Sequence, residues 1–173
     1  MKKNPGGVTF TMNLHFTNEY PASCLDEIVG YLLGPRLWIP RIQYPDFDEW
    51  LHKSFIELKN EQKRAMVALS GNDIAGVALY QRHKKDPRAL EIKNLTVRPD
   101  MRGRYIASFL LRNVEIEGAR DFNSSHIVCD AKADNLPIQT FLVRHRYEAL
   151  KREDLYQKGA GHDIIYKKKL AYI

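Results

Sequence analysis

The chain contains little cysteine and no long apolar run. It has two cysteines in 173 residues, too few for a disulfide framework, so a reduced, cytoplasmic setting is expected. No apolar run reaches the roughly 20 residues of a membrane-spanning helix, and no membrane partner is expected. Residues 1–7 lack the apolar segment of a signal peptide and are expected to form a flexible N-terminal tail.

The chain also lacks the clustered histidines and cysteines of a metal site. Its six histidines are scattered without metal-ligand spacing, and Cys24 and Cys129 are far apart in the sequence. We therefore expect no metal. Cys129 falls on a strand that is predicted to be buried, where a small core residue is a commoner role than a nucleophile.

Positive charge exceeds negative charge by six, and three short basic clusters carry much of the excess. These clusters are residues 82–85, 144–146 and 167–169. A basic surface can bind nucleic acid, but short basic runs at the ends of helices and strands are more often solvated. An anionic cofactor would use the same charge, so a nucleic-acid partner stays a secondary alternative.

Hydrophobic periodicity predicts a single mixed α/β domain over residues 8–173. Alternating or short buried apolar runs predict strands, and apolar residues spaced three and four apart predict helices. Turn formers at residues 71–73 join two strands into a hairpin. The predicted strands are residues 8–16, 65–70, 74–81, 90–97, 127–131, 147–151 and 163–170, and the predicted helices are residues 22–33, 46–60, 103–119 and 135–145.

The resulting element order is β-α-α-β-β-β-α-β-α-β-β, which is the order of an α/β fold with a mixed sheet. In the fourth strand the alternation of apolar residues slips by one position near Asn94, which predicts a β-bulge. The helix over residues 103–119 is predicted to pack an apolar stripe against the core and to expose Arg112, Glu115 and Glu117.

The stretch from Leu95 to Leu111 carries the clearest functional signal. It reads as a strand, a turn broken by proline and the start of a helix, with Arg98, Arg102 and Arg104 at the junction. Positive side chains oppose the helix dipole at this end and lose on the order of 0.3–1 kcal/mol each. An anion held between the arginines and free backbone N–H groups would reverse that sign. The stretch therefore predicts a phosphate-binding turn.

This stretch and a second motif resemble the GNAT superfamily of N-acetyltransferases. The family's pyrophosphate loop, Q/R-x-x-G-x-G/A after V-x-P, falls on residues 97–107, with Arg102 to Ala107 in the loop positions. The family pattern N-x-x-A-I-x-x-Y-x-x-x-G-F falls on Asn135 to Tyr147 without a gap. The element order agrees as well, so the resemblance covers nearly the whole chain from Val8.

The resemblance implies a GNAT-like fold in which two parallel strands, residues 91–97 and 127–131, splay apart around acetyl-CoA. Backbone groups of the first strand would bind the pantetheine arm, and N–H groups of the turn would bind the pyrophosphate. The resemblance assigns this binding to Leu95, Thr96, Val97, Arg102, Gly103, Arg104, Tyr105, Ile106, Ala107, Ser108 and Asn135.

The sequence departs from the family pattern in both motifs. Tyr105 stands where the family has glycine, and helical geometry would lean its side chain toward the phosphates. Leu142 stands where the family often has a tyrosine that protonates the leaving thiolate, and Arg146 with Tyr147 replaces Gly-Phe. Leu142 cannot act as this general acid. A displaced tyrosine, such as Tyr105 or Tyr147, could take its place, or the acetyl group could be transferred without a general acid.

The resemblance also implies a catalytic base. Glu91 lies six residues before Val97, the place of a strand glutamate that serves as base, often through water, in the histone-acetyltransferase branch. A lysine-like amine has a pKa of about 10.4, so a base must generate the attacking amine at neutral pH. The alternative is that Glu91 is a strand carboxylate paired with Lys93 or with a hairpin arginine.

The sequence thus predicts an acetyl-CoA-dependent N-acetyltransferase that acts on a primary amine of a small molecule or a protein. Two alternatives stay open: a non-catalytic module that binds acyl-CoA or a protein partner, and an acetyltransferase of a nucleic-acid-linked amine. The sequence does not identify the acceptor amine, and it is compatible with a homodimer.

Overall fold

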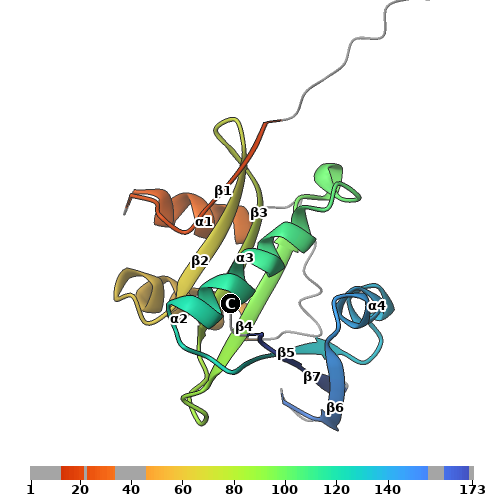
Figure 1. Ribbon diagram of the computed structural model, residues 1–173. Helices are drawn as coiled ribbons and strands as arrows, with labels where there is room; N and C mark the ends of the chain where they lie inside the picture. The colour runs from red at the N-terminus through yellow and green to blue at the C-terminus, as the bar shows by residue number, and fades with distance from the viewer. Residues whose placement is uncertain (1–12, 22, 34–45, 156–161, 172–173) are drawn as a thin grey trace, which may run out of the picture.

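The computed structural model describes residues 13–21, 23–33, 46–155 and 162–171. The predicted tail and the first part of the predicted first strand lie outside these ranges. The described elements follow the predicted order (Figure 1). The strands are β1 Leu14–Thr17, β2 Arg64–Ser70, β3 Asp73–Arg82, β4 Ala89–Val97, β5 His126–Lys132, β6 Glu148–Glu153 and β7 Asp163–Lys169, and the helices are α1 Cys24–Leu33, α2 Phe47–Lys59, α3 Ile106–Arg120 and α4 Leu136–Arg144, with a 3-10 turn η2 at Pro99–Met101.

The strands form one mixed sheet in the order β1-β2-β3-β4-β5-β7-β6. Its neighbouring strands are antiparallel, with the exception of β4 and β5, which run parallel. A parallel pair needs a crossover, and α3 supplies it. The predicted fold class, a mixed α/β sheet with one parallel pair at its centre, is confirmed.

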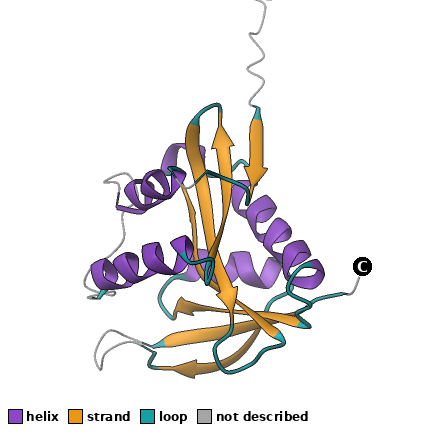
Figure 2. Ribbon diagram, turned by 90° about the vertical axis from the view of Figure 1, so that its left-hand side faces the viewer, coloured by secondary structure: helices purple, strands orange, loops and turns teal. Residues whose placement is uncertain are grey.

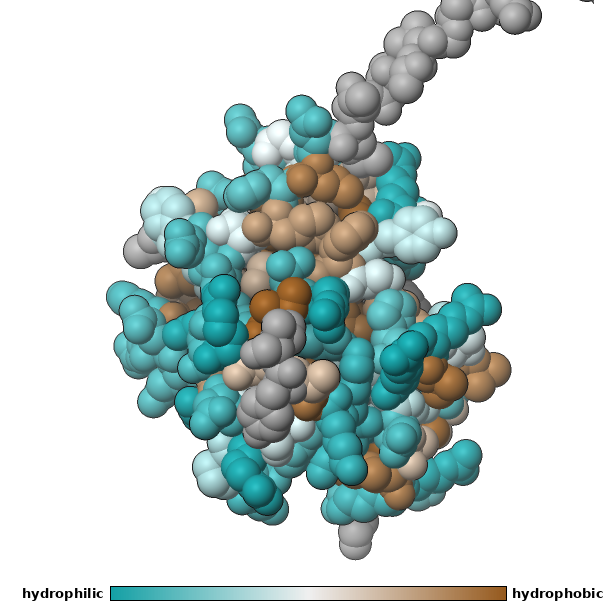
Figure 3. Space-filling view, viewed as in Figure 1, coloured by the Kyte–Doolittle hydropathy of each residue, from teal (hydrophilic) through white to brown (hydrophobic). Residues whose placement is uncertain are grey.

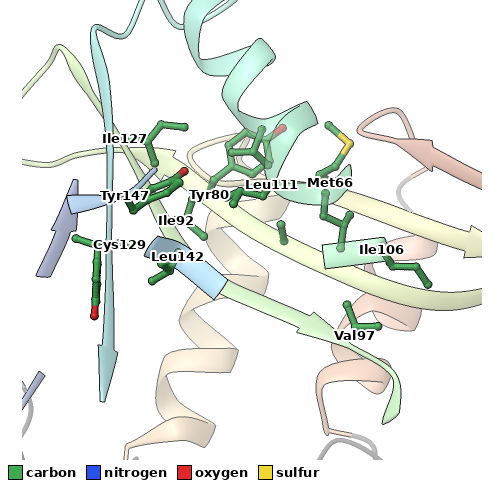
Figure 4. Close-up of a cluster of buried hydrophobic side chains, with 14 of the residues drawn as sticks. Met66, Tyr80, Ile92, Val97, Ile106, Leu111, Ile127, Cys129, Leu142 and Tyr147 are labelled. Carbon is green, nitrogen blue, oxygen red and sulfur yellow. The ribbon is translucent and has the colours of Figure 1, made fainter. Parts of the chain in front are cut away.

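Helices cover both faces of the sheet, as the side view shows (Figure 2). Alternate residues of β2 and β3 point to opposite faces, as strand geometry requires. Val67 and Val77 join the core under α1 and α2, whereas Ala68 and Ala78 join the core under α3. The face that carries α3 has an apolar area in the upper centre and is mostly hydrophilic below it (Figure 3), and the core beneath α3 holds the apolar side chains of Figure 4.

Two details of α3 differ from the sequence prediction. The helix begins at Ile106 and not at Gly103, because Gly103 and Tyr105 have φ values of +74° and +61° in the left-handed region. Glu115 and Glu117, which were predicted to be exposed, are only 4% and 3% exposed. Each carboxylate is buried with a cation: Lys168 binds Glu115 at 2.6 Å, and Arg64 binds Glu117 at 2.7 Å.

A membrane-spanning role finds no support in the described helices, since none of them is long and apolar enough to cross a bilayer. The described helices range from 9 to 15 residues.

Candidate active site

The parallel strands β4 and β5 pair at one end and separate at the other. Their register runs from Ala89 opposite His126 to Ile92 opposite Cys129 and then stops. In the ladder with β3, Ile92 faces Tyr80 and Asn94 faces Leu79, so Lys93 is an extra residue. This is the predicted bulge near Asn94, and a bulge bends the strand that carries it. The rest of β4 therefore leaves β5, and a gap opens between them.

The backbone of β4 beyond the bulge directs polar groups into this gap. The Arg98 N–H donates to the carbonyl oxygen of Ala75 at 2.9 Å, so Arg98 faces β3. Backbone groups alternate in an antiparallel ladder, which places those of Thr96 toward β3 and those of Leu95 and Val97 toward the gap. Of the three β4 residues predicted to bind the pantetheine arm, two thus present their backbone to the gap.

The turn after β4 leads into a helix N-terminus that no side chain caps. Tyr105 occupies the N-cap position but makes no side-chain cap bond, and the first turn of α3 has no acidic residue. The first bond within the helix runs from the Phe109 N–H to the Tyr105 oxygen at 3.0 Å. The N–H groups of Ile106, Ala107 and Ser108 therefore have no acceptor within the helix, and they carry the positive end of its dipole.

The charged residues of the turn leave this helix end positive. The Arg102 Nε donates to the Val97 carbonyl oxygen at 3.2 Å, which ties the turn back to β4. Both nearby carboxylates pair with Arg98: Asp100 accepts from its Nε at 2.8 Å, and Asp73 lies 3.9 Å from its Nη1. Residues 102–105 are exposed, so the turn is open to a ligand.

Tyr105 does not lie where helical geometry would put it. The residue is left-handed and precedes the helix, so its Cβ does not follow the helical direction. Its side chain is 76% exposed. The expectation that it leans toward the phosphates rested on a helical backbone and does not hold for this conformation.

Asn135 has a structural role at the start of α4. Its side-chain oxygen accepts from the Ile138 N–H at 3.4 Å, which is an N-cap bond. The helix end of α4 is thus closed by its own side chain, unlike that of α3. Asn135 is an exposed residue, and its predicted contact with the cosubstrate stays a prediction.

Glu91 points away from α3. Its neighbours Leu90 and Ile92 belong to the core under α3, so alternation directs Glu91 to the face that carries α1 and α2. One carboxylate oxygen accepts from the Gln81 side-chain amide at 3.1 Å, and the other lies 3.0 Å from the Lys93 Nζ. The pairing with Lys93 that was the alternative for Glu91 is present in the structure.

Other candidates for proton transfer or nucleophilic attack are buried. Leu142 is 3% exposed and Tyr147 is 2% exposed, both in the core of Figure 4. The Tyr147 hydroxyl donates to Glu115 at 3.4 Å, and burial raises the pKa of this phenol. Burial also raises the pKa of the Cys129 thiol, so Cys129 is a core residue. No group of three metal-ligating side chains occurs among the described residues.

Gly76 is a residue of this site that the sequence analysis missed. A Cβ at Gly76 would lie 3.0 Å from the Thr96 oxygen, 3.0 Å from Leu110 Cδ1 and 3.2 Å from Ile106 Cγ2. The missing side chain lets the first turns of α3 lie directly on β3, beside the part of β4 that has left β5. The available signal was a glycine inside a predicted strand, because such a glycine often marks a place where another segment of backbone or a ligand packs closely against the strand.

Comparisons with solved structures agree with this architecture. A GNAT-family protein from Desulfovibrio desulfuricans is 14% identical with a TM-score of 0.77, over 92% of this chain and 100% of that one. A variant of spermidine N-acetyltransferase SpeG from Vibrio cholerae is 12% identical, with a TM-score of 0.67 over 91% and 94% of the two chains. RimL, a ribosomal L7/L12 alpha-N-protein acetyltransferase in complex with coenzyme A, is 13% identical, with a TM-score of 0.69 over 94% and 97%.

The sequence comparisons decide the family. The search of curated proteins gives no match. The family model described as "Acetyltransferase (GNAT) family" matches residues 25–146, which is more than half of the chain and includes the bulged strand, the turn and both helices after it. With this match, the chain belongs to the GNAT family of acetyltransferases.

Proposed function

We propose that this acetyltransferase uses acetyl-CoA and that its active site lies at the open end of β4 and β5, where it acetylates a primary amine. The observation that carries the proposal is that the gap between the strands leads to the uncapped N-terminus of α3, whose first turn has no acidic side chain. Such a helix end binds phosphate through its N–H groups. The RimL structure holds coenzyme A, which supports the same cosubstrate here.

The residues fit the two polar parts of this cosubstrate. The N–H groups of Ile106, Ala107 and Ser108 would hold the pyrophosphate, with the exposed turn from Arg102 to Tyr105 around it. The backbone of Leu95 and Val97 would pair with the amides of the pantetheine arm. Acetyl-CoA would supply an acetyl group that is already activated as a thioester.

Glu91 is the proposed base. A protonated amine must lose a proton before it can attack, and Glu91 would accept this proton directly or through a water molecule. Its carboxylate already binds one ammonium group, that of Lys93 at 3.0 Å. A cationic acceptor would compete with Lys93 for the same carboxylate, and the ion pair supports the proposal that Glu91 binds the amine.

The leaving group needs no acid from the protein. A thiol that resembles cysteine has a pKa of about 8.5 and can leave as a thiolate. Leu142 offers no proton, and the Tyr147 hydroxyl is bonded to Glu115 inside the core. The Leu95 N–H, which faces the gap, would stabilise the negative charge that develops on the thioester oxygen.

The test of Glu91 is a steady-state assay of thiol release with acetyl-CoA and an amine. Glu91→Gln should lower kcat by roughly 10²–10⁴-fold, the usual contribution of a general base, and should leave the affinity for acetyl-CoA unchanged. Glu153→Gln, which alters an exposed strand carboxylate on β6, is the matched control and should behave like the wild type. Full activity of Glu91→Gln would remove Glu91 as the base.

The acceptor is proposed only as a class. The names of the SpeG and RimL structures give spermidine and a protein α-amino group as acceptors, and both are primary amines. A panel of polyamines, peptides with free N-termini and lysine peptides would separate these kinds. A non-catalytic module would show no amine-dependent thiol release, and a nucleic-acid-linked acceptor would require RNA binding with a steep salt dependence.

The cellular setting rests on weaker signals. Cys24 and Cys129 are both free thiols, in accord with the reducing, cytoplasmic location that we propose. A homodimer stays a prediction, and sedimentation of the purified protein would test it.

A further inference from the structure

A second concave site lies on the α3 side of the sheet, between α3 and the corner where α4 leads into β6. It is a pocket of about 590 Å³, within the range of small-molecule sites. Arg112, Glu115, Ile116 and Ala119 line one wall from a single face of α3. Arg112 follows Ile106 by six residues, which places this wall about 9 Å or more along the helix axis from the uncapped N-terminus.

Two of the basic clusters seen in the sequence meet at this pocket. Arg144 and Arg146 from the end of α4, Lys168 from β7 and Arg112 from α3 line it. Lys167 and Lys169 of β7 line it as well. The buried Glu115 is already matched, by Lys168 at 2.6 Å and Arg112 at 3.4 Å.

Arg144 and Arg146 are left without a carboxylate partner. Neither lies within ion-pair distance of an acidic side chain in the part of the chain that the structure describes. A helix C-terminus favours positive charge, which accounts for a cation at Arg144. It does not account for the backbone of Arg146, whose φ of +66° lies in the left-handed region. Glycine is the usual residue there, directly after a helix, so an arginine at this position carries a backbone cost that glycine would not.

The pocket also has an apolar wall, formed by Ile116, Ala119 and Leu170, and its lining includes the polar side chains of His145 and Glu148. An apolar wall beside two unpaired guanidinium groups matches a ligand that joins a flat ring to a phosphate, since arginine binds phosphate with two parallel hydrogen bonds. We propose that this pocket binds a nucleoside phosphate, with the base against Ile116 and the phosphate at Arg144 and Arg146, separately from the acetyl-CoA site.

The test is calorimetry of the full chain with ADP as the probe, with and without saturating coenzyme A. ADP should bind in both conditions. Arg146→Gly should weaken ADP about tenfold, as expected for one charge-assisted contact, yet melt at or above the wild-type temperature because glycine relieves the left-handed backbone. Arg88→Gln, which removes an exposed arginine outside the pocket, is the charge-matched control and should leave ADP binding unchanged.

Three outcomes would overturn the proposal. Loss of ADP binding in saturating coenzyme A would mean that the nucleotide enters only the cosubstrate site. Equal ADP affinity of Arg146→Gly and the wild type would remove the pocket. If Arg146→Gly weakens coenzyme A but not dephospho-coenzyme A, which lacks the 3′-phosphate, the arginine serves the cosubstrate itself. Thiol release by Arg146→Gly is a separate readout, so failure here leaves the proposed acetyltransferase activity untouched.

Discussion

Helix α3 packs closely against the sheet at two glycines, Gly76 of β3 near its first turns and Gly118 near its last turn. The atoms that surround the two glycines differ. A Cβ on Gly76 would press on the Thr96 carbonyl oxygen as well as on side chains of α3, all at 3.0–3.2 Å. A Cβ on Gly118 would meet only side-chain tips, Leu90 Cδ2 at 3.0 Å and Leu170 Cδ1 at 3.4 Å. The first contact lies at the open end of β4 and β5, and the second lies at the closed end. A side chain would therefore be harder to accommodate at the end where the proposed ligand binds than at the end where the strands are paired.

Gly76→Ala should have the largest effect. A backbone oxygen cannot move as a side-chain tip can, so the first turns of α3 must shift away from β3, at a cost of roughly 1–3 kcal/mol in the free energy of unfolding. The same shift moves the Ile106 and Ala107 N–H groups, and acetyl-CoA affinity should fall at least about tenfold. Urea unfolding and calorimetry measure the two effects.

Gly118→Ala is the matched control for this change. Alanine gains about 1 kcal/mol of helix propensity over glycine, which offsets the displacement of the Leu90 side chain. Stability should change little, and acetyl-CoA affinity should not change. If both variants weaken acetyl-CoA equally, the two ends of α3 are not different in the way described.

Ser108→Glu should come next, because it places a negative charge at the open end. A carboxylate in the first turn of α3 interacts favourably with the dipole and should raise stability by about 0.3–1 kcal/mol. It would also repel the pyrophosphate by roughly 1–3 kcal/mol, or tenfold to a hundredfold in affinity. Ser108→Gln separates charge from size. Unchanged affinity in Ser108→Glu would place the phosphates elsewhere.

Sequence reasoning recovered the order of the elements and the opening of the strands. The slip in apolar alternation near Asn94 predicted a bulge because a strand has a strict period of two, and Lys93 is the extra residue. The arginines at the turn predicted an anion site because they oppose the dipole of α3. The bulge could be predicted because it depends on neighbours in sequence, and the anion site, which rests on the same kind of local signal, stays a prediction.

The features that sequence reasoning missed depend on partners distant in sequence. Glu115 and Glu117 were taken as the polar back of α3, yet they are buried, with Lys168 and Arg64 beside them. Each partner is 53 residues away. The start of α3 at Ile106 was missed because a left-handed tyrosine is rare and no local pattern announces it.

Asn135→Ala should have a smaller effect that tests the contrast between two helix ends. The side chain caps α4, so its loss should lower the free energy of unfolding by about 1 kcal/mol. If capping is its whole role, Asn135→Asp should restore stability, and acetyl-CoA affinity should be the same in all three proteins. A fall in affinity for Asn135→Ala that Asn135→Asp does not recover would support the predicted contact with the cosubstrate.

The smallest effect is expected at the closed end, where His126 lies opposite Ala89 at the start of the parallel pairing. Burial, followed by the charge of Lys167, holds the pKa of His126 below its usual value, although Asp86 lies 3.3 Å away and acts in the opposite sense. The unfolded chain has a histidine pKa of about 6.5. As the pH falls below that value toward the folded pKa, the unfolded state therefore binds more protons, and stability declines.

Urea midpoints measured from pH 7.5 downward should fall less steeply in His126→Gln than in the wild type. The affinity for acetyl-CoA should follow the same pH curve in both proteins, because His126 is at the end of the strands that stays closed. Parallel stability curves for the two proteins would show that His126 does not titrate differently on folding.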